Sequence, residues 1–218
     1  MKEKFFVVLV TIAIIVFCLY DYKSDKVYHQ EEDLLNKIEA RGYLIAGVKT
    51  DTRPFGYIKD GKNVGFDIDI AKRIARDIFH DESKIKFVEV TPSTRLYKLN
   101  SGEVDIIVAT MTITAERQKL VNFSSPYFVA QEAVLVRSNS RISSLYDLSG
   151  HSVGILYGST GEKDARLLVP TSNLVGYKTY HEAYLALKSG LISAIISGDT
   201  LMRHFTLVDP SVKLLPKK

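Results

Sequence analysis

Residues 104–117, with the sequence VDIIVATMTITAER, predict a buried strand that leads directly into the start of a helix. The apolar and small residues that follow Asp105 are typical of a strand covered on both faces. Thr114 has the position and chemistry of a helix N-cap. Arg117, however, falls in the first helical turn, where a cation is unfavourable, so an anionic group is expected beside it. Threonine hydroxyls, backbone N–H groups and this guanidinium together predict a carboxylate-binding site.

The segment ATMTITAERQKLVNFSSPYF (109–128) resembles the central motif of the extracellular solute-binding proteins of family 3, which bind polar amino acids for ABC importers. Two further segments, PFGYIKDGKNVGFDIDIAKRIA (54–75) and SLYDLSGHSVGILYGSTGEKDA (144–165), resemble two more of the family's motifs in the family's order. The resemblance extends from Leu34 to the end of the chain. It implies a periplasmic-binding-protein type 2 fold, in which two α/β lobes joined by hinge strands close on a ligand.

The composition argues against several other classes of site. The chain has 29 basic and 25 acidic residues, a formal charge of +4, and no block of five like charges, which is untypical of nucleic-acid binding. Its one Cys forms neither an internal disulfide nor a Cys-rich metal site, and its five His show no metal-ligand spacing. No metal and no cofactor are therefore expected.

Residues 1–20 are expected to be a targeting segment, and residues 21–33 a polar tether. The stretch from residue 5 to residue 20 is apolar apart from Thr11, a length between that of a signal peptide and that of a spanning helix. Cys18 stands where a lipoprotein carries its acylated cysteine, although Phe17 replaces the small residue usual before it. An uncleaved membrane anchor, a lipoprotein signal and a cleaved secretory peptide stay open. Each places the rest of the chain on the extracellular or periplasmic side.

Hydrophobic periodicity predicts alternating strands and helices in two successive lobes, residues 34–136 and 137–218. Strands are expected over residues 43–48, 85–90, 105–109, 132–137, 152–156, 174–177, 194–197 and 212–215. Helices are expected over residues 31–41, 67–79, 93–100, 143–148, 161–168 and 181–189. A hairpin over 55–66 should turn at Asp60-Gly61, and Asp67 should cap the next helix. Each lobe is expected to hold a mainly parallel sheet flanked by helices, with a ligand cleft between the lobes.

The chain ends at Lys218, directly after the last predicted strand. Members of the family continue with a strand that returns to the first lobe and with one or two terminal helices. The resemblance therefore predicts that lobe one lacks its C-terminal return segment and that the second hinge strand is missing. Either a fragment of a longer protein or the product of a degraded gene would have this form.

The resemblance also implies roles for single residues. Arg117 would hold the α-carboxylate of the ligand, and Thr160, in a Gly/Ser turn before a helix, would assist it. Thr110 and Thr112 match contact positions of the family, and their alternation along a strand would direct both hydroxyls to one side. Asp199 would bind the α-ammonium of the ligand, with a helix N-cap as its alternative role.

Lys49 and Arg95 match family positions that contact the side-chain end of the ligand. Two cations there favour an acidic side chain, because a buried cation without a counter-charge is costly. We therefore expect a monomeric binding protein for glutamate or aspartate, with glutamine as an option, and permease subunits of an ABC importer as its partners. No catalytic residue is expected. An enzyme on the same fold, such as a cyclohexadienyl dehydratase, and the sensor domain of a receptor are the alternative functions.

Overall fold

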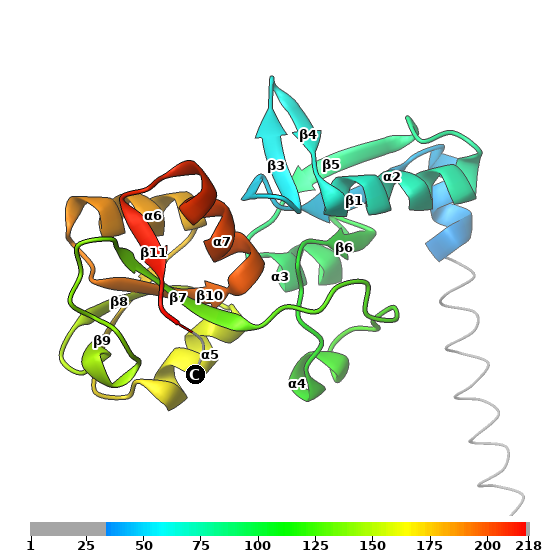
Figure 1. The fold of residues 1–218 in the computed structure, drawn as a ribbon. Helices are drawn as coiled ribbons and strands as arrows, with labels where there is room; N and C mark the ends of the chain where they lie inside the picture. Colours follow the sequence, from blue (N-terminus) through cyan, green and yellow to red (C-terminus); the bar gives the residue numbers. More distant parts are fainter. Residues whose placement is uncertain (1–33, 217–218) are drawn as a thin grey trace, which may run out of the picture.

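The computed structural model describes residues 34–216, which form two α/β lobes lying side by side (Figure 1). The first lobe is built on a parallel sheet of three strands in the order β5 (Ile85–Glu89), β1 (Leu44–Val48), β6 (Ile106–Val108). Helix α2 (Phe66–Phe79) packs against this sheet, and α3 (Arg95–Asn100) connects β5 to β6. The predicted two-lobed α/β fold is thereby confirmed.

The core of the first lobe lies between α2 and the sheet. Ile68 and Ala71 on α2 are fully buried against Ala46 and Val48 on β1 and against Val108 on β6. A second cluster joins Leu44 and Ala75 to Ile38, which belongs to the helix over residues 34–41. This burial follows from the helical spacing of the apolar residues on α2.

A small antiparallel sheet of β2 (Asp51–Thr52), β3 (Gly56–Lys59) and β4 (Lys62–Val64) projects from the first lobe. The predicted hairpin turn is confirmed between β3 and β4. Asp60 and Gly61 have φ angles of 51° and 72°, as a two-residue turn matched to the twist of its strands requires.

The second lobe contains five strands in the order β11 (Val212–Leu214), β7 (Glu132–Arg137), β10 (Ala194–Gly198), β8 (Ser152–Leu156), β9 (Asn173–Tyr177). Strands β10, β8 and β9 run parallel to one another, and β7 is antiparallel to both β10 and β11. Strand β7 thus lies within the second sheet, so the predicted division of the lobes at residue 136 has to move to the start of this strand. The pairing of β7 with β10 over five residue pairs is the reason.

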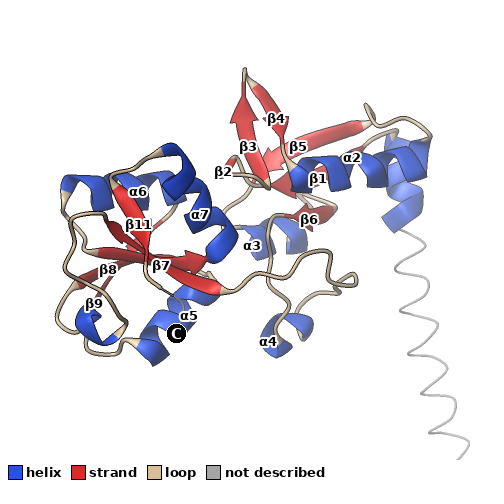
Figure 2. Ribbon diagram, in the orientation of Figure 1, coloured by secondary structure: helices blue, strands red, loops and turns tan. Residues whose placement is uncertain are grey.

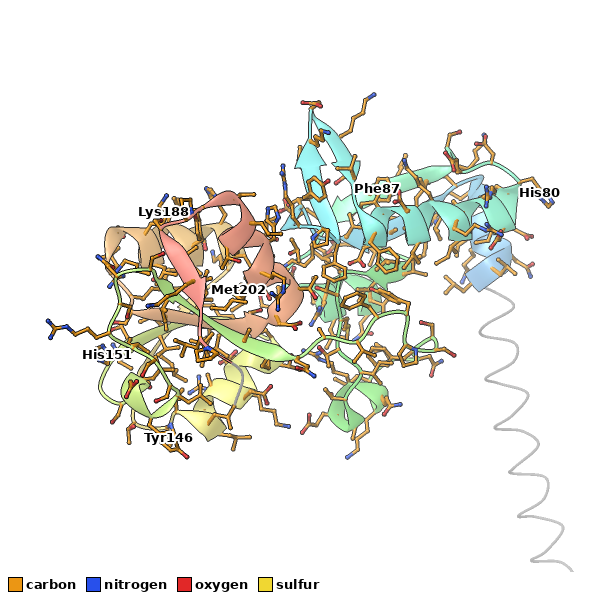
Figure 3. The ribbon with its side chains drawn as sticks, viewed as in Figure 1. His80, Phe87, Tyr146, His151, Lys188 and Met202 are labelled. Atoms are coloured by element: carbon orange, nitrogen blue, oxygen red, sulfur yellow. The ribbon has the colours of Figure 1, made fainter. Side chains whose placement is uncertain are left out.

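Helices cover both faces of the second sheet (Figure 2). Helices α6 (Tyr180–Ser189) and α7 (Asp199–Val208) bury Leu187 and Met202 against one face. Met202 is labelled in Figure 3. Helix α5 (Thr160–Leu168) and the short 3-10 helix η1 (Tyr146–Leu148) cover the other face. On β10, Ile195 faces the first cluster and Ile196 the second, as expected where both faces of a strand are buried.

Within residues 34–216 no helix has the length and apolar character needed to cross a bilayer. The same part of the chain contains no group of three or more His, Cys, Asp or Glu side chains placed to hold a metal ion. The predicted targeting segment and the whole predicted tether lie in residues 1–33, outside the described residues.

Candidate functional site

A cleft of about 600 Å³ lies between the two lobes. The first lobe lines it with the loop that follows β6, and the second lobe lines it with the N-terminal ends of α5, α6 and α7. The segment over residues 123–131, which joins the lobes, forms a third side. The polar side chains of its lining include Thr52, Arg95, Thr110, Thr112, Glu132, Thr160, Asp164, Tyr180 and Thr200.

The loop after β6 differs from the strand that the sequence predicts. Strand β6 ends at Val108, and Thr110 has a φ of 47°, in the left-handed region that a β-branched residue adopts at a cost. The Thr110 backbone N–H donates to the buried carboxylate of Asp67 (3.0 Å), which stabilises this turn. The predicted alternation of Thr110 and Thr112 along a strand is therefore wrong.

Asp67 does not cap α2, contrary to prediction. The N-cap of α2 is Gly65, and no side chain makes a cap hydrogen bond there. The Asp67 side chain is fully buried and accepts from both the Thr110 N–H and the Tyr127 hydroxyl (3.2 Å). Burial raises the pKa of Asp67 to about 6, although both hydrogen bonds act in the opposite direction.

Arg117 lies on α4 (Ala115–Gln118), whose predicted N-cap is confirmed, because the Thr114 hydroxyl accepts from the Arg117 N–H. The half-buried guanidinium donates to two carbonyl oxygens, that of Thr112 (2.8 Å) in its own lobe and that of Gly158 (2.9 Å) in the other. It therefore bridges the lobes. A guanidinium has five N–H donors, so three remain for an anion.

Arg95 is the most deeply buried cation that lines the cleft, with 3% of its surface exposed. One guanidinium nitrogen donates to the Ala109 carbonyl oxygen (2.9 Å), whereas the buried Nε has no hydrogen-bond partner among the described residues. Burial and then the nearby Arg117 cation lower the pKa of Arg95 to about 10. A buried donor left in this state is costly, so an acceptor from a ligand would be strongly favoured here.

Lys49 is not part of the lining and already has a counter-charge. Its ammonium lies 3.4 Å from Asp51 and 4.3 Å from the ring centroid of Tyr180. Burial lowers the pKa of Lys49, and Asp51 offsets part of that effect. The other oxygen of Asp51 accepts from the Tyr180 backbone N–H (2.7 Å), so this group connects the first lobe to the start of α6 in the second.

Thr112 and Thr160 meet across the cleft, with their hydroxyl oxygens 3.4 Å apart. Thr160 is the first residue of α5, whose N-cap Ser159 accepts from the Glu162 N–H. The Thr160 hydroxyl also lies near the carboxylate of Glu132, at the start of β7, where it acts to lower the pKa of that carboxyl group. Both lobes thus contribute hydroxyl groups to one side of the cleft.

Asp199 is the first residue of α7, and the N-cap is Gly198, which corrects the alternative role of Asp199 as an N-cap. Its carboxylate accepts from the Gln131 N–H (3.3 Å), and its own N–H donates to the Gln131 carbonyl oxygen. The neighbouring Gly198 and Thr200 line the cleft, although Asp199 itself does not.

The structure therefore places Arg95, Thr110, Thr112 and Thr160 in the cleft lining. Arg117 and Asp199 lie next to lining residues, and Lys49 is paired with Asp51 outside the lining. The sequence analysis assigned no place in the site to several polar residues that line the cleft or contact its lining, namely Asp51, Asp67, Tyr127, Glu132 and Tyr180. Glu132 is the first residue of a predicted strand, and a charged residue at that end of a strand was a signal that could have indicated a place near the cleft. Asp67 and Tyr127 lie within the quoted family motifs, but no local pattern indicates that their side chains meet at the cleft.

Comparison with known proteins identifies a family and several relatives. The profile of the bacterial extracellular solute-binding proteins, family 3, matches residues 44–209. A glutamine-binding protein of Geobacillus stearothermophilus is 44% identical over 83% of this chain and 70% of its own length. The ABC transporter glutamine-binding protein of Bacillus subtilis is 40% identical over 93% of this chain and 77% of its own. The crystal structure of a cysteine-binding protein from Campylobacter jejuni superposes with a TM-score of 0.80 at 35% identity, covering 83% of this chain and 73% of that one.

Proposed function

The chain belongs to the bacterial extracellular solute-binding proteins of family 3, and we propose that L-glutamine is the amino acid that it binds. Its role is that of an extracellular or periplasmic amino-acid-binding subunit of an ABC importer. Binding takes place in the cleft between the lobes, and it requires no bond in the ligand to break. Permease subunits of the importer are the partners that would receive the ligand.

One observation carries the choice of site. Arg95 is buried, it lines the cleft, and its Nε has no partner among the described residues. A ligand oxygen that accepted from this group would satisfy a donor that the described protein leaves unsatisfied. The side-chain carbonyl oxygen of glutamine and the side-chain carboxylate of glutamate both have the required chemistry.

The charges around the cleft support the amide over the acid. The expectation of an acidic ligand rested on two uncompensated cations, but Asp51 already neutralises Lys49. Glu132 and Asp164 add carboxylates to the lining, and these would repel a second negative charge on the ligand. Two relatives of at least 40% identity are glutamine-binding proteins, which supports the same choice.

In the proposed complex, Arg117 holds the α-carboxylate together with the hydroxyls of Thr112 and Thr160. Asp199 holds the α-ammonium from the second lobe. Arg95 donates to the side-chain amide oxygen. Contacts from both lobes to one small zwitterion would hold the lobes in a closed arrangement. Closure of the lobes around the ligand is the working motion of such a protein.

Isothermal titration calorimetry on the full chain tests this proposal. Glutamine should bind at least about tenfold more tightly than glutamate or aspartate, a difference of about 1.4 kcal/mol. Arginine and cystine serve as ligands of other size and charge. Tighter binding of glutamate would restore the acidic ligand, and mass spectrometry of the recovered glutamine would reveal any conversion that an enzyme on this fold would cause.

A further inference from the structure

The two walls of the cleft carry opposite charge. On the first lobe Arg95 lines the cleft, and Arg117 lies beside it. On the second lobe the charged lining residues are Glu132 and Asp164, and Asp199 lies next to the lining residues Gly198 and Thr200. Such a field orients an amino acid zwitterion with its carboxylate towards the first lobe and its ammonium towards the second.

Glu132 is the acid best placed to meet that ammonium. It opens β7, where it pairs with Gly198, directly before Asp199. Its side chain reaches the first turn of α5, because a Cβ added to Gly161 would lie 3.5 Å from Glu132 Oε2. Glu132 therefore stands between Thr160 and Asp199, the two second-lobe residues assigned to the α-carboxylate and the α-ammonium.

A second observation, independent of the acidic residues, also points to a ligand in the cleft. Arg95 on the opposite wall is nine-tenths buried or more, and its Nε lacks a partner within residues 34–216. A ligand that satisfies Arg95 with one end presents its other polar groups to the second lobe. The acidic wall and the unsatisfied guanidinium are thus two separate features of one amino acid site.

Resting on the proposed function, we propose that Glu132 is a second carboxylate for the α-ammonium of the ligand and that binding displaces a proton from Glu132 to solvent. The ammonium of the bound amino acid takes the place of that proton as the positive partner of the carboxylate. No bond in the ligand changes. Binding would then become tighter as the pH rises through neutrality.

The surroundings of Glu132 support a proton on it before ligand arrives. Although Glu132 is partly exposed to solvent, partial desolvation, then Asp164 on α5 and Asp199 on α7, raise its pKa to about 7, and the nearby Thr160 hydroxyl opposes this. Tyr180 on α6 also faces it and is neutral at this pH. A cationic ligand group favours the ionised form, so it would lower the pKa of Glu132 on binding.

Calorimetry of glutamine binding to the full chain at pH 5.5, 6.5, 7.5 and 8.5, in buffers of different ionisation enthalpy, tests this. Wild type should release a fraction of a proton near pH 7, and its dissociation constant should rise by up to about tenfold per pH unit below that. Glu132→Gln should remove both effects and weaken binding at pH 8.5 by about tenfold. Asp77→Asn, at an exposed site on α2, is the matched control and should behave as wild type.

A ligand without the α-amino group sharpens the test. Glutaramate, which is glutamine lacking that group, should bind weakly and without proton release in wild type. Because every amino acid has the ammonium, arginine or glutamate should show the same proton release as glutamine if either binds. Proton release that persists in Glu132→Gln, or affinity that falls as the pH rises, would overturn the assignment of Glu132. If wild type binds no amino acid at all, the proposed function is overturned, and this inference with it.

Discussion

The buried carboxylate of Asp67 accepts a hydrogen bond from the backbone N–H of Thr110, 3.0 Å away and 43 positions later in the chain. The same carboxylate accepts from the Tyr127 hydroxyl. Thr110 and Tyr127 both line the cleft, so one side chain on α2 positions the loop after β6 and the segment that joins the lobes. Asp67 contributes to the site by holding other residues in place.

Replacement of Asp67 with Asn should change how stability depends on pH. Because burial raises the folded-state pKa of Asp67 to about 6, the folded chain holds this proton more tightly than the unfolded chain. The contribution of Asp67 is greatest at low pH and falls as the pH rises from about 4 to 6, by on the order of 2–3 kcal/mol. Urea unfolding at pH 4, 5, 6 and 7 should therefore show a difference between wild type and Asp67→Asn that moves in favour of the variant as the pH rises. If the difference in the free energy of unfolding between wild type and Asp67→Asn does not change with pH, the pKa of Asp67 is not raised in the folded protein.

Arg117→Ala should strongly weaken the binding of every amino acid, because all of them share the α-carboxylate. Removing a charged hydrogen-bond partner costs about 2–5 kcal/mol, or roughly 30- to several-thousand-fold in affinity. Arg117→Lys keeps the positive charge but loses the planar guanidinium, so its affinity should lie between those of wild type and Arg117→Ala. Calorimetry measures the loss, and Arg73→Ala on the exposed face of α2 is the control. Full affinity in Arg117→Ala would remove this residue from the site.

Arg95→Gln should separate binding from stability. The variant removes a buried cation whose Nε has no partner within the described residues, so the ligand-free protein should unfold at the same or a higher urea concentration. The affinities for glutamine and glutamate should both fall. The fall should be larger for glutamate, because only its side-chain carboxylate would lose an ion pair with Arg95. Equal losses for the two ligands would show that Arg95 does not contact the side-chain end.

Asp51→Asn should lower the free energy of unfolding more than removal of both charges of the Lys49–Asp51 ion pair does. It leaves the buried ammonium of Lys49 without its carboxylate, at a cost of about 3 kcal/mol in the free energy of unfolding. The double variant Lys49→Met, Asp51→Asn should recover much of that loss in a double-mutant cycle. If the two single changes add, the ion pair does not hold Lys49 in place. Lys49→Met should also leave the ratio of glutamine to glutamate affinity close to that of wild type.

Much of the secondary structure could be predicted because its signals are local. The bounds predicted for the strands over 132–137 and 152–156 agree with β7 and β8, since continuous apolar runs ended by polar residues mark buried strands. The Thr114 cap and the Asp60-Gly61 turn follow from the backbone preferences of those residues. Errors occurred at ends, where β6 stops early and α4 is a single turn.

The sequence by itself determined the two-lobed α/β fold and the family, and it predicted a carboxylate-binding site beside Arg117. These depend on periodicity, on caps and on motifs that lie within short stretches of chain. Only the tertiary structure decided that Asp51 neutralises Lys49, that Arg95 is buried with an unsatisfied donor, and that Glu132 faces the cleft. The state of a charged group depends on its solvation and on its nearest partners. Chain segments far apart in the sequence supply those partners, so folding alone brings them together.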